Sequence, residues 1–462
     1  MHYEKFPDGS VKCIENEIPF ELPQGWEWTR IASVCLVNPR NTLEDSLQVS
    51  FVPMSLIKEG FSNSYTTEVK EWKKVKKGFT HFAESDIAIA KITPCFENRK
   101  SVIFSNLKNK YGAGTTELHI LRAIDILPEY ILWIIKTEDF ISKGVQAFTG
   151  AVGQQRVGKN FISNYFIPIP PLVEQKRIVD KINELFYLIS LIETDKITLQ
   201  ATIQLTKSKI LDLAIRGKLV PQDPNDEPAS VLLEHIRAEK EELIKQGKIK
   251  RDKKESVIFR GEDNSYYEKI GDTVTCIDEE LPFDLPDNWA WIRLSSACII
   301  NPKNNIADDT VVSFVPMTLI QNGYTSEFMF EQRKWGEVKK CFTHFAENDV
   351  GFAKITPCFE NRKSVIFRGL CNGYGAGTTE LHILRAYPDT ILPEYFLYLV
   401  KTESFISGGK QTFSGAVGQQ RVSKEYVYNY LCPVPPLNEQ QRIIEKCSEI
   451  ITTLNSVEEI LS

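Results

Sequence analysis

The chain has 462 residues, of which 42% are hydrophobic and 11% aromatic, so it can form two or three domains with sizeable cores. The formal net charge of −6 excludes neither DNA nor protein partners, because a nucleic-acid binder needs only a local basic surface. No apolar run approaches the ~18 residues that cross a membrane, and no two cysteines form a CxxC pair, so we expect a cytoplasmic protein with reduced thiols and no zinc site.

Two long segments of the chain repeat one another. The string AKITPCFENRKSVIF fills residues 90–104 and again residues 353–367, an offset of 263 (353 − 90). YGAGTTELHILRA fills residues 111–123 and 374–386 at the same offset. After two inserted residues in the second copy, PIPPLVEQKRI is matched by PVPPLNEQQRI. Each copy covers roughly 170 residues, which is the size of a domain, so the sequence predicts two copies of one globular domain.

The two copies, residues 1–173 and 263–437, are predicted to be mixed α/β domains. In the first copy, short apolar runs at residues 85–92 and 117–123 favour strands, and the amphipathic stretch 127–142 favours one helix. Turn-forming residues separate these runs. The predicted fold class is therefore mixed α/β, with each element present twice.

A long helix is predicted over residues 174–222. Apolar residues recur there at spacings of three and four, the pattern of a helix that lies along another helix, and Gly217 and Pro221 end it. The pattern returns in residues 438–462, which match only the first half of the central helix, so we expect the second spacer helix to be short. The two helices are expected to pack antiparallel as a rigid spacer, with simple tethering as the alternative. The seam consists of Ile178, Ile182, Leu185, Ile189, Ile192, Leu199, Ile203, Ile210 and Leu213, followed by Ile443, Ile450, Leu454, Val457 and Leu461.

The rest of the connection, residues 223–262, is expected to hold a charged helix, PASVLLEHIRAEKEELIKQ, and a basic linker, KIKRDKKE. Acidic residues accumulate between and after the copies. Each copy also holds a basic run, KEWKKVKKGF at residues 70–79 and the weaker RKWGEVKKCF at residues 333–342, so the negative total charge does not describe the local charge.

No catalytic or metal-binding motif is complete. GQQRVGKN, residues 153–160, fits a phosphate loop except that Asn160 replaces the Ser or Thr that would hold magnesium, and Ser423 replaces the second glycine in the other copy. His81 and His119 lie in apolar runs and not in Cys–His clusters, so we interpret them as core residues. The (D/N)PP(Y/F) loop of amino-methyltransferases is absent from the sequence. The chain is predicted to carry no catalytic residue, metal or cofactor of its own.

Side chains suited to reading DNA lie in glycine-bearing or basic loops that both copies share. Gln and Asn can recognise adenine, Arg can recognise guanine, and Lys, Ser and Thr suit phosphates, although any one of these residues can instead serve a turn or an ion pair. In the first copy the candidate DNA-binding residues are Lys73, Lys74, Lys76, Lys77, Asn98, Arg99, Lys100, Thr115, Thr116, Gln154, Gln155 and Arg156. In the second copy they are Lys339, Lys340, Asn361, Arg362, Lys363, Thr378, Thr379, Gln419, Gln420 and Arg421.

With these features the chain resembles the specificity subunits of type I restriction–modification systems. The resemblance is carried by LPQGWEWTRIASVCLVNPR and PIPPLVEQKRIV in the first copy, by AKITPCFENRKS and GAGTTELHILR in both, and by KLVPQDPNDEPASVLLEHIRAEKEELIKQGKIKRDKK between them. It spans essentially the whole chain.

The resemblance implies a non-catalytic subunit with two target recognition domains, separated by long antiparallel coiled-coil-like helices and related by internal pseudo-two-fold symmetry. Each domain is expected to read one half of a split target in double-stranded DNA. The spacer helices are expected to dock two adenine methyltransferase subunits, through which the restriction subunits join. S-adenosylmethionine, ATP and magnesium would belong to those partners.

The likeness of the two copies adds an expectation of its own. Because both domains carry nearly the same candidate reading surface, the two half-sites are expected to be the same sequence inverted, which gives a palindromic or near-palindromic target. Two other classes of function stay open at this point: an enzyme that acts alone with unfamiliar motifs, and a structural adaptor that holds two partner proteins without touching DNA. A steep salt dependence of duplex binding would separate the reader from the adaptor.

Overall fold

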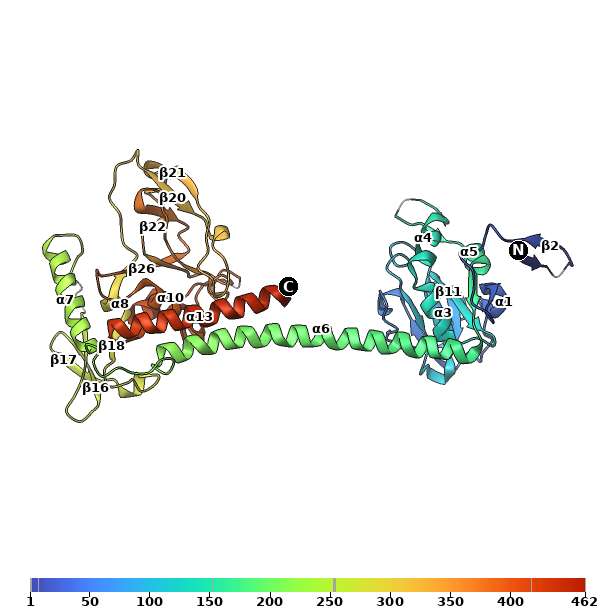
Figure 1. Ribbon diagram of the computed structural model, residues 1–462, viewed down its shortest axis with the longest axis horizontal. Coiled ribbons are helices and arrows are strands. Elements are labelled where there is room, and N and C mark those ends of the chain that lie inside the picture. Colours follow the sequence, from blue (N-terminus) through green and yellow to red (C-terminus); the bar gives the residue numbers. More distant parts are fainter. Residues whose placement is uncertain (1, 7, 152, 252–254, 417, 462) are drawn as a thin grey trace. The chain divides into compact units, whose positions relative to one another are not determined.

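The computed structural model describes residues 2–6, 8–151, 153–251, 255–416 and 418–461. The chain divides into two compact units, Met1–Glu193 and Thr194–Ser462 (Figure 1). Each unit holds one copy of the repeat, and unit 2 also holds the last part of the long central helix. Within the described residues, no helix combines the length and the apolar character that spanning a membrane requires.

Two four-stranded sheets form the frame of unit 1, in the orders β6-β5-β10-β7 and β4-β11-β8-β9. The neighbours β5 and β10 are parallel, and the other neighbours are antiparallel. Strands β10 and β11 follow one another in the chain but belong to different sheets, so the loop of residues 115–117 crosses between the sheets. The strands are β4 (Cys35–Val37), β5 (Gln48–Val52), β6 (Glu68–Glu71), β7 (Thr80–Ala83), β8 (Ile87–Ala90), β9 (Ser101–Ile103), β10 (Tyr111–Gly114) and β11 (Leu118–Ala123).

Close packing between the sheets explains part of the repeated sequence. The ring of Phe82 in β7 stacks on that of Phe104, which directly follows β9 of the other sheet, with centroids 3.7 Å apart. A Cβ at Gly112 would lie 2.0 Å from the Phe82 ring, so only glycine fits opposite that ring. The same arrangement recurs in unit 2 with Phe345 and Gly375. The YGAG string is thus required by the core.

The amphipathic stretch 127–142 forms two helices, α3 (Pro128–Ile135) and α4 (Glu138–Gln146), and the prediction of one continuous helix was wrong. Thr137 has extended backbone angles between them, and its hydroxyl accepts a hydrogen bond from Phe140 N at 3.3 Å. This side chain caps the N-terminus of α4, so a new helix begins there. In unit 2, Thr402 separates α10 (Pro393–Lys401) from α11 (Glu403–Gln411) in the same way.

Unit 2 repeats both sheets with the same strand order, which confirms the predicted duplicated mixed α/β fold. The orders are β21-β20-β25-β22 and β19-β26-β23-β24. The strands are β19 (Cys298–Ile300), β20 (Val311–Val315), β21 (Glu331–Lys334), β22 (Thr343–Ala346), β23 (Val350–Ala353), β24 (Ser364–Ile366), β25 (Tyr374–Gly377) and β26 (Leu381–Ala386).

Smaller elements complete both units. Short helices are α1 (Ile31–Val34), α2 (Trp72–Val75), α5 (Lys159–Asn164), α8 (Leu294–Ala297), α9 (Trp335–Val338) and α12 (Lys424–Asn429). Two-stranded pairs are β1 (Tyr3–Lys5) with β2 (Val11–Cys13), β3 (Glu27–Arg30) with β14 (Phe166–Ile169), β12 (Phe148–Thr149) with β13 (Arg156–Val157), and β18 (Ala290–Arg293) with β27 (Leu431–Val434). The strands β15 (Ser256–Arg260), β16 (Tyr266–Ile270) and β17 (Thr273–Cys276) form a three-stranded sheet.

The predicted long helix is α6 (Leu172–Ile215), and the C-terminal helix is α13 (Leu437–Leu461). Within unit 2 the two pack antiparallel (Figure 1): Lys207 Nζ lies 2.6 Å from a Glu458 carboxylate oxygen, whereas Gln222, just beyond α6, bonds Glu439 near the start of α13. Gly217 ends α6 with a φ of +65°. The predicted antiparallel pair is confirmed.

The seam of α6 is covered over only part of its length. In unit 2, Ile203 of α6 is buried, and the partly buried Ile210 packs against the core that includes Ile443 of α13. Further toward the N-terminal end of α6, Leu185, Ile189, Ile192 and Leu199 are exposed. The C-terminal part of the seam thus packs against α13, as expected for a short second helix, and Ile178 packs against the core of unit 1, whereas those four residues between them are exposed.

The charged helix is α7 (Ala229–Lys245), as predicted. It buries Leu232, Leu233 and Ile236 in the core of unit 2. Of the predicted basic linker, residues 252–254 lie outside the described residues, and Arg251 pairs with Glu241 at 2.6 Å. This part of the connection therefore packs on unit 2.

Candidate nucleic-acid interface

Three loops that are far apart in the sequence meet in unit 1 around Lys91. The Lys91 backbone N–H donates to Glu117 O at 2.9 Å, and its carbonyl accepts from Val157 N at 2.9 Å. Thr93 N donates to Gln155 O at 3.0 Å. The loop after β8, the loop 115–117 and the β12–β13 hairpin are thereby fixed to one another. The structure thus brings together the predicted residues Thr115, Thr116, Gln154, Gln155 and Arg156.

The β12–β13 hairpin presents its amide side chains to solvent. Gly150 and Gly153 hold φ angles of +112° and +82° at the hairpin tip, values that favour glycine. Gln154 is exposed and Gln155 is half-buried. Among the described residues, neither side chain has a hydrogen-bond partner, so both amides are available to a ligand.

Arg156 is held by Glu117 from the neighbouring loop. Its Nε and Nη2 donate to the two carboxylate oxygens at 2.8 and 3.1 Å, and its Nη1 donates to Gln154 O at 2.8 Å. Hydrogen bonding and the positive charge of Arg156 hold the pKa of Glu117 below its usual value. A guanidinium has five N–H donors, so two remain on the outer edge of a side chain that is 40% exposed.

Unit 2 repeats this geometry. Arg421 donates to Glu380 at 2.9 and 2.8 Å and to Gln419 O at 3.0 Å, and it is 42% exposed. Gly415 and Gly418 hold φ angles of +114° and +83° at the hairpin tip. The predicted set Thr378, Thr379, Gln419, Gln420 and Arg421 is therefore assembled as its counterpart is in unit 1.

Asn98 and Arg99 contact residues of their own domain away from these three loops. Arg99 donates to Lys136 O at 3.0 Å and pairs with Glu138 at the α3–α4 junction, and its guanidinium faces the Phe61 ring at 5.4 Å. Asn98 donates to Glu59 at 3.2 Å. In unit 2, Arg362 makes the same contacts with Lys401 O and Glu403, next to Asn361 and Lys363. At 22% and 18% exposed, both arginines hold a loop against a helix end.

Beneath Arg99 lies a buried lysine that no sequence signal marked. Lys136 Nζ donates to the carbonyls of Gly60, Ser62 and Arg99 at 2.6, 3.1 and 3.2 Å. Burial lowers its pKa to about 8. Lys401 in unit 2 is also fully caged by carbonyls, and burial lowers its pKa to about 7. These lysines fix the same loops as the arginines above them.

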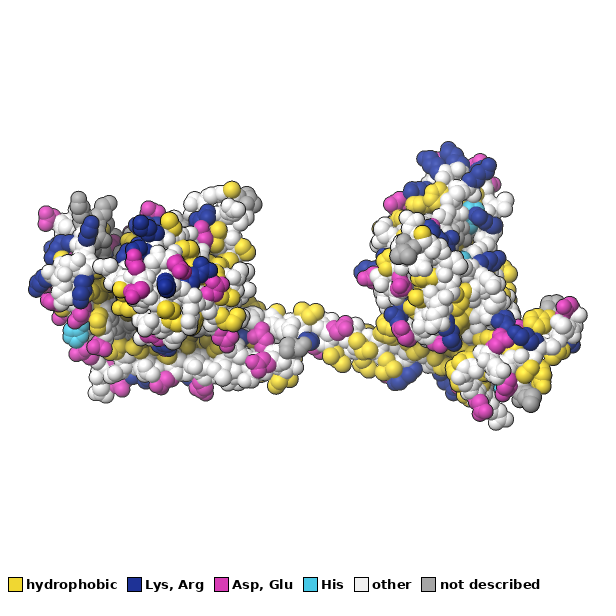
Figure 2. Space-filling model, turned by 90° about the horizontal axis from the view of Figure 1, so that it is seen from above, with side chains coloured by type: hydrophobic (Ala, Val, Ile, Leu, Met, Phe, Trp, Pro, Cys, Tyr) yellow, Lys and Arg dark blue, Asp and Glu magenta, His cyan; other side chains and the backbone are white. Residues whose placement is uncertain are grey.

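The basic run lies on and after α2, and Figure 2 shows Lys and Arg side chains gathered at one end of unit 1. Lys73, Lys74 and Lys77 are exposed. Lys73 lies 2.8 Å from Glu71, and Lys76 lies 2.7 Å from Asp45, so part of the charge is neutralised within the domain. In unit 2, Lys339 pairs with Asp308 at 2.6 Å, and Lys340 is exposed.

A polar cavity of about 290 Å³ connects the basic run to the three loops. It is lined by Asn38, Arg40, Phe79, His81, Lys91 and Thr116, among others. Arg40 and Lys91 were not among the predicted residues, because they lie in different parts of the sequence and belong to no motif. Their common position became visible only from the loop contacts.

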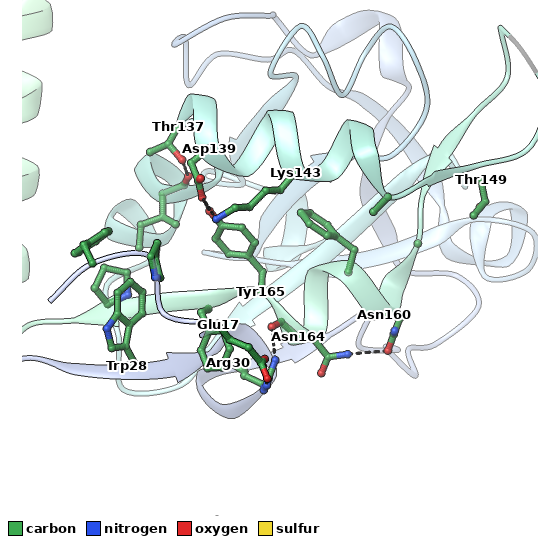
Figure 3. A pocket seen from close by; sticks show the side chains of 18 residues that line it. Glu17, Trp28, Arg30, Thr137, Asp139, Lys143, Thr149, Asn160, Asn164 and Tyr165 are labelled. Carbon is green, nitrogen blue, oxygen red and sulfur yellow. Dashed lines mark hydrogen bonds and ion pairs between the residues drawn. The ribbon is translucent and has the colours of Figure 1, made fainter. Parts of the chain in front are cut away.

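Unit 1 also has a larger, mainly apolar pocket of about 1000 Å³ on its β3–β14 side, lined by Trp28, Phe161 and Tyr165 (Figure 3). Its charged groups are paired: Tyr165 Oη donates to Asp139 at 2.5 Å, and Arg30 binds Glu4. The equivalent pocket of unit 2 is about 510 Å³, and there Arg216 from the end of the seam helix stands 4.9 Å over the Phe283 ring.

The remaining titratable candidates are structural. His119 is buried, and its ring nitrogens bond Val157 O at 3.0 Å and the Asn38 amide at 3.2 Å, while burial lowers its pKa. All ten cysteines have free thiols. Among the described residues there is no group of three or more His, Cys, Asp or Glu side chains that could hold a metal ion.

Comparison with known proteins identifies the family. The family described as Type I restriction modification DNA specificity domain matches residues 23–201 and 286–462. The specificity subunit of the type I restriction enzyme EcoAI of Escherichia coli is 34% identical over 501 aligned residues, which cover 97% of this chain and 81% of that subunit. The chain belongs to the type I restriction–modification specificity subunits. Such a subunit determines DNA specificity and is a non-catalytic component of the enzyme.

Another relative and two solved structures were also found, and the structures share the fold. The specificity subunit of the E. coli enzyme EcoEI is 40% identical over 350 residues, 64% of this chain and 56% of that subunit. The HsdS subunit from Thermoanaerobacter tengcongensis shares the fold with a TM-score of 0.57 at 17% identity, over 97% of this chain and 94% of that one. A chain from a structure of type I complex assembly and conformational transition gives a TM-score of 0.60 at 18% identity, over 96% and 94%.

Proposed function

We propose that this specificity subunit reads a bipartite DNA target whose two halves are the same sequence inverted, or nearly so. The observation that carries the proposal is a duplicated surface. The loop after β8, the loop 115–117 and the β12–β13 hairpin, with the hydrogen bonds that join them, all recur in unit 2. The Arg156–Glu117 pair of unit 1 has its counterpart in Arg421–Glu380 of unit 2. Two domains joined through an antiparallel spacer, as expected in this family, would face the duplex in opposite directions and read opposite strands.

The geometry favours the β12–β13 hairpin and its counterpart as the base readers. Gln154 and Gln155 have unoccupied amides, which suit adenine, and the two remaining donors of Arg156 suit the O6 and N7 acceptors of guanine. Because Glu117 fixes the guanidinium before DNA arrives, little side-chain freedom is lost on binding. We assign Arg99 and Arg362 to holding the loops, since their contacts run to the helix junction.

The two basic runs are proposed to contact phosphates. Lys73 and Lys74 of unit 1 are replaced by Gly336 and Glu337 in unit 2. Lysines on the backbone supply affinity without sequence information. The difference between the copies should therefore change the affinity of the two half-sites more than their base preference.

The exposed apolar strip of α6 is proposed to dock the methyltransferase subunits. Leu185, Ile189, Ile192, Leu199 and Leu205 are between 43% and 71% exposed. Figure 2 shows hydrophobic side chains along this helix. A patch of this kind marks a protein contact. Restriction subunits would join through the methyltransferase, and S-adenosylmethionine, ATP and magnesium would bind to these partners and not to this chain.

A duplex-binding assay tests this function against the adaptor alternative. The purified chain should bind duplex DNA with an affinity that falls steeply between low and high salt, because phosphate contacts release counterions. By itself it should transfer no methyl group and cleave no DNA. Absence of any salt-dependent binding would favour a structural adaptor.

A further inference from the structure

We propose that the polar cavity around Lys91, and the equivalent side chains of unit 2, bind a backbone phosphate of the DNA next to the base-reading hairpin. The site is defined in unit 1 by Arg40, Lys91 and Thr116, and in unit 2 by Lys303, Lys354 and Thr379. The inference rests on the proposed function, because it assumes that this face of each domain meets the duplex.

The cavity carries positive charge that the domain leaves uncompensated. Among the described residues, the Lys91 side chain makes no hydrogen bond or ion pair, and the Arg40 guanidinium makes one hydrogen bond, to Phe79 O at 3.1 Å. The carboxylate next to Lys91 is that of Glu117, which is already bound by Arg156. No carboxylate of the described part of the chain lines the cavity. Two cations beside the exposed Thr116 are the groups that recognise a phosphate.

His81, which also lines this cavity, has a structural role. His81 Nδ1 accepts a hydrogen bond from Asn41 N at 3.3 Å, and its Nε2 lies 3.1 Å from Lys76 O, so both ring nitrogens are used. Burial, and to a lesser extent the charge of Arg40, lower the pKa of His81, which keeps the ring neutral. His344 makes the same two contacts in unit 2, at 3.2 and 3.0 Å. The cation pair is thus the group left for a ligand.

A difference between the two copies indicates that the ligand of this site is a phosphate and not a base. Position 40 is Arg in unit 1, and its counterpart, residue 303, is Lys in unit 2, whereas Lys91 and Lys354 are identical. A base contact that uses the planar fork of arginine would not survive this exchange. A phosphate needs only the charge, which both copies keep. The neighbouring readers Gln154 and Arg156 are unchanged in the second copy, as base contacts should be.

The position of the cavity suits this role. It lies between the basic run, to which Arg40 is joined through Phe79 O, and the hairpin, to which Lys91 is joined through Val157 N. A phosphate seated there would fix the register of the duplex against Gln154 and Arg156. Contacts of this kind position the protein without reading sequence.

The test replaces Lys91 and Lys354 together in the full chain. Lys91→Met/Lys354→Met keeps the aliphatic stems and removes both charges, whereas Lys91→Arg/Lys354→Arg keeps the charges. For duplexes with and without the target, binding is measured across a salt series. The Met variant should lose about 2 from the slope of log affinity against log salt, since each phosphate contact contributes roughly 0.9. It should weaken both duplexes by the same factor, and the Arg variant should bind as the wild type does.

Lys181→Ala/Lys446→Ala is the matched control. These exposed lysines occupy equivalent positions on α6 and α13, each beside a glutamate, so the variant removes the same two charges away from the site. It should leave the slope unchanged. A wild-type slope in the Met variant would overturn the phosphate site, and so would a change in the preference for target over non-target duplex. If the wild-type chain itself shows no salt-dependent binding, the proposed function fails and not this site alone.

Discussion

Arg156 and Arg99 are both paired arginines in repeated loops, yet their surroundings differ. Glu117 binds the Nε and Nη2 groups of Arg156, and two N–H donors of this guanidinium stay available to a ligand. Arg99 instead bonds the α3–α4 junction and is only 22% exposed. Arg156→Lys should keep the charge but remove the planar guanidinium, which can donate two parallel hydrogen bonds to one base. Discrimination at one base pair should therefore fall by about 1–3 kcal/mol. Competition binding with single-base substitutions in each half-site measures this loss.

Arg99→Ala provides the contrast. It removes a hydrogen bond to Lys136 O and should lower the stability of unit 1 by about 1 kcal/mol without changing base preference. Arg421→Lys should relax the other half-site at the mirror-related position. If Arg99→Ala changed base preference and Arg156→Lys did not, the assignment of readers would be reversed.

His382 makes the stability of unit 2 depend on pH. Burial lowers its pKa from 6.5 to about 4, so the folded state keeps the ring neutral where the unfolded chain would bind a proton. The stabilisation is complete above pH 6.5 and is lost as the pH falls toward 4, by up to about 3 kcal/mol. Denaturant unfolding between pH 4 and 7 should show this loss, and His382→Gln should flatten it. An unchanged pH dependence in the variant would contradict the assignment.

Sequence reasoning at the residue scale identified the hairpin and the basic run but not their connection. Thr116, Gln154 and Arg156 stand in strings repeated between the copies, which is a visible signal. Arg40 and Lys91 follow β4 and β8, which are far apart in the sequence. Both strands pair antiparallel with β11, so the sheet places their C-terminal ends at the same edge. Arg99 is bound by residues of its own domain. Such tertiary contacts cannot be predicted from the spacing of residues in the sequence.

At the scale of elements, the heptad pattern predicted the helices and their antiparallel pairing but not which half is covered. The pattern is the same whether a seam packs within the chain or awaits another protein. Ile189 and Leu199 were expected to be buried in the helix pair, and they are 49% and 43% exposed. The expectation that these two seam residues pack within the helix pair was therefore wrong.

This exposure gives a prediction with an internal control. Ile189→Asp should leave the thermal unfolding of the purified chain unchanged and prevent co-elution with the methyltransferase. Ile203→Asp lies where α6 meets α13, with only 3% of the side chain exposed, so it should destabilise unit 2 by several kcal/mol. Calorimetry and size-exclusion chromatography measure the two effects. Normal assembly of the Ile189→Asp variant would remove the docking role from the strip.

At the scale of the whole molecule, duplication is the feature from which the function follows. The copies share sheet order, the Gly112–Phe82 packing, the capped helix break and the hairpin with its Arg–Glu pair. The residues that differ include charged surface positions, such as Lys73 and Lys74 against Gly336 and Glu337. The sequence alone predicted this duplication because the repeated strings are identical, whereas the recognised bases depend on contacts that the free protein does not show.

Methylome sequencing of a host that carries this subunit with its methyltransferase tests the central claim most directly. We predict one bipartite motif whose two half-sites are the same sequence inverted, or differ at one position, around a non-specific gap. Exchange of the two copies within the chain should then leave the motif unchanged. Two unrelated half-sites would contradict a symmetric target, because the bases would then be read by residues in which the copies differ.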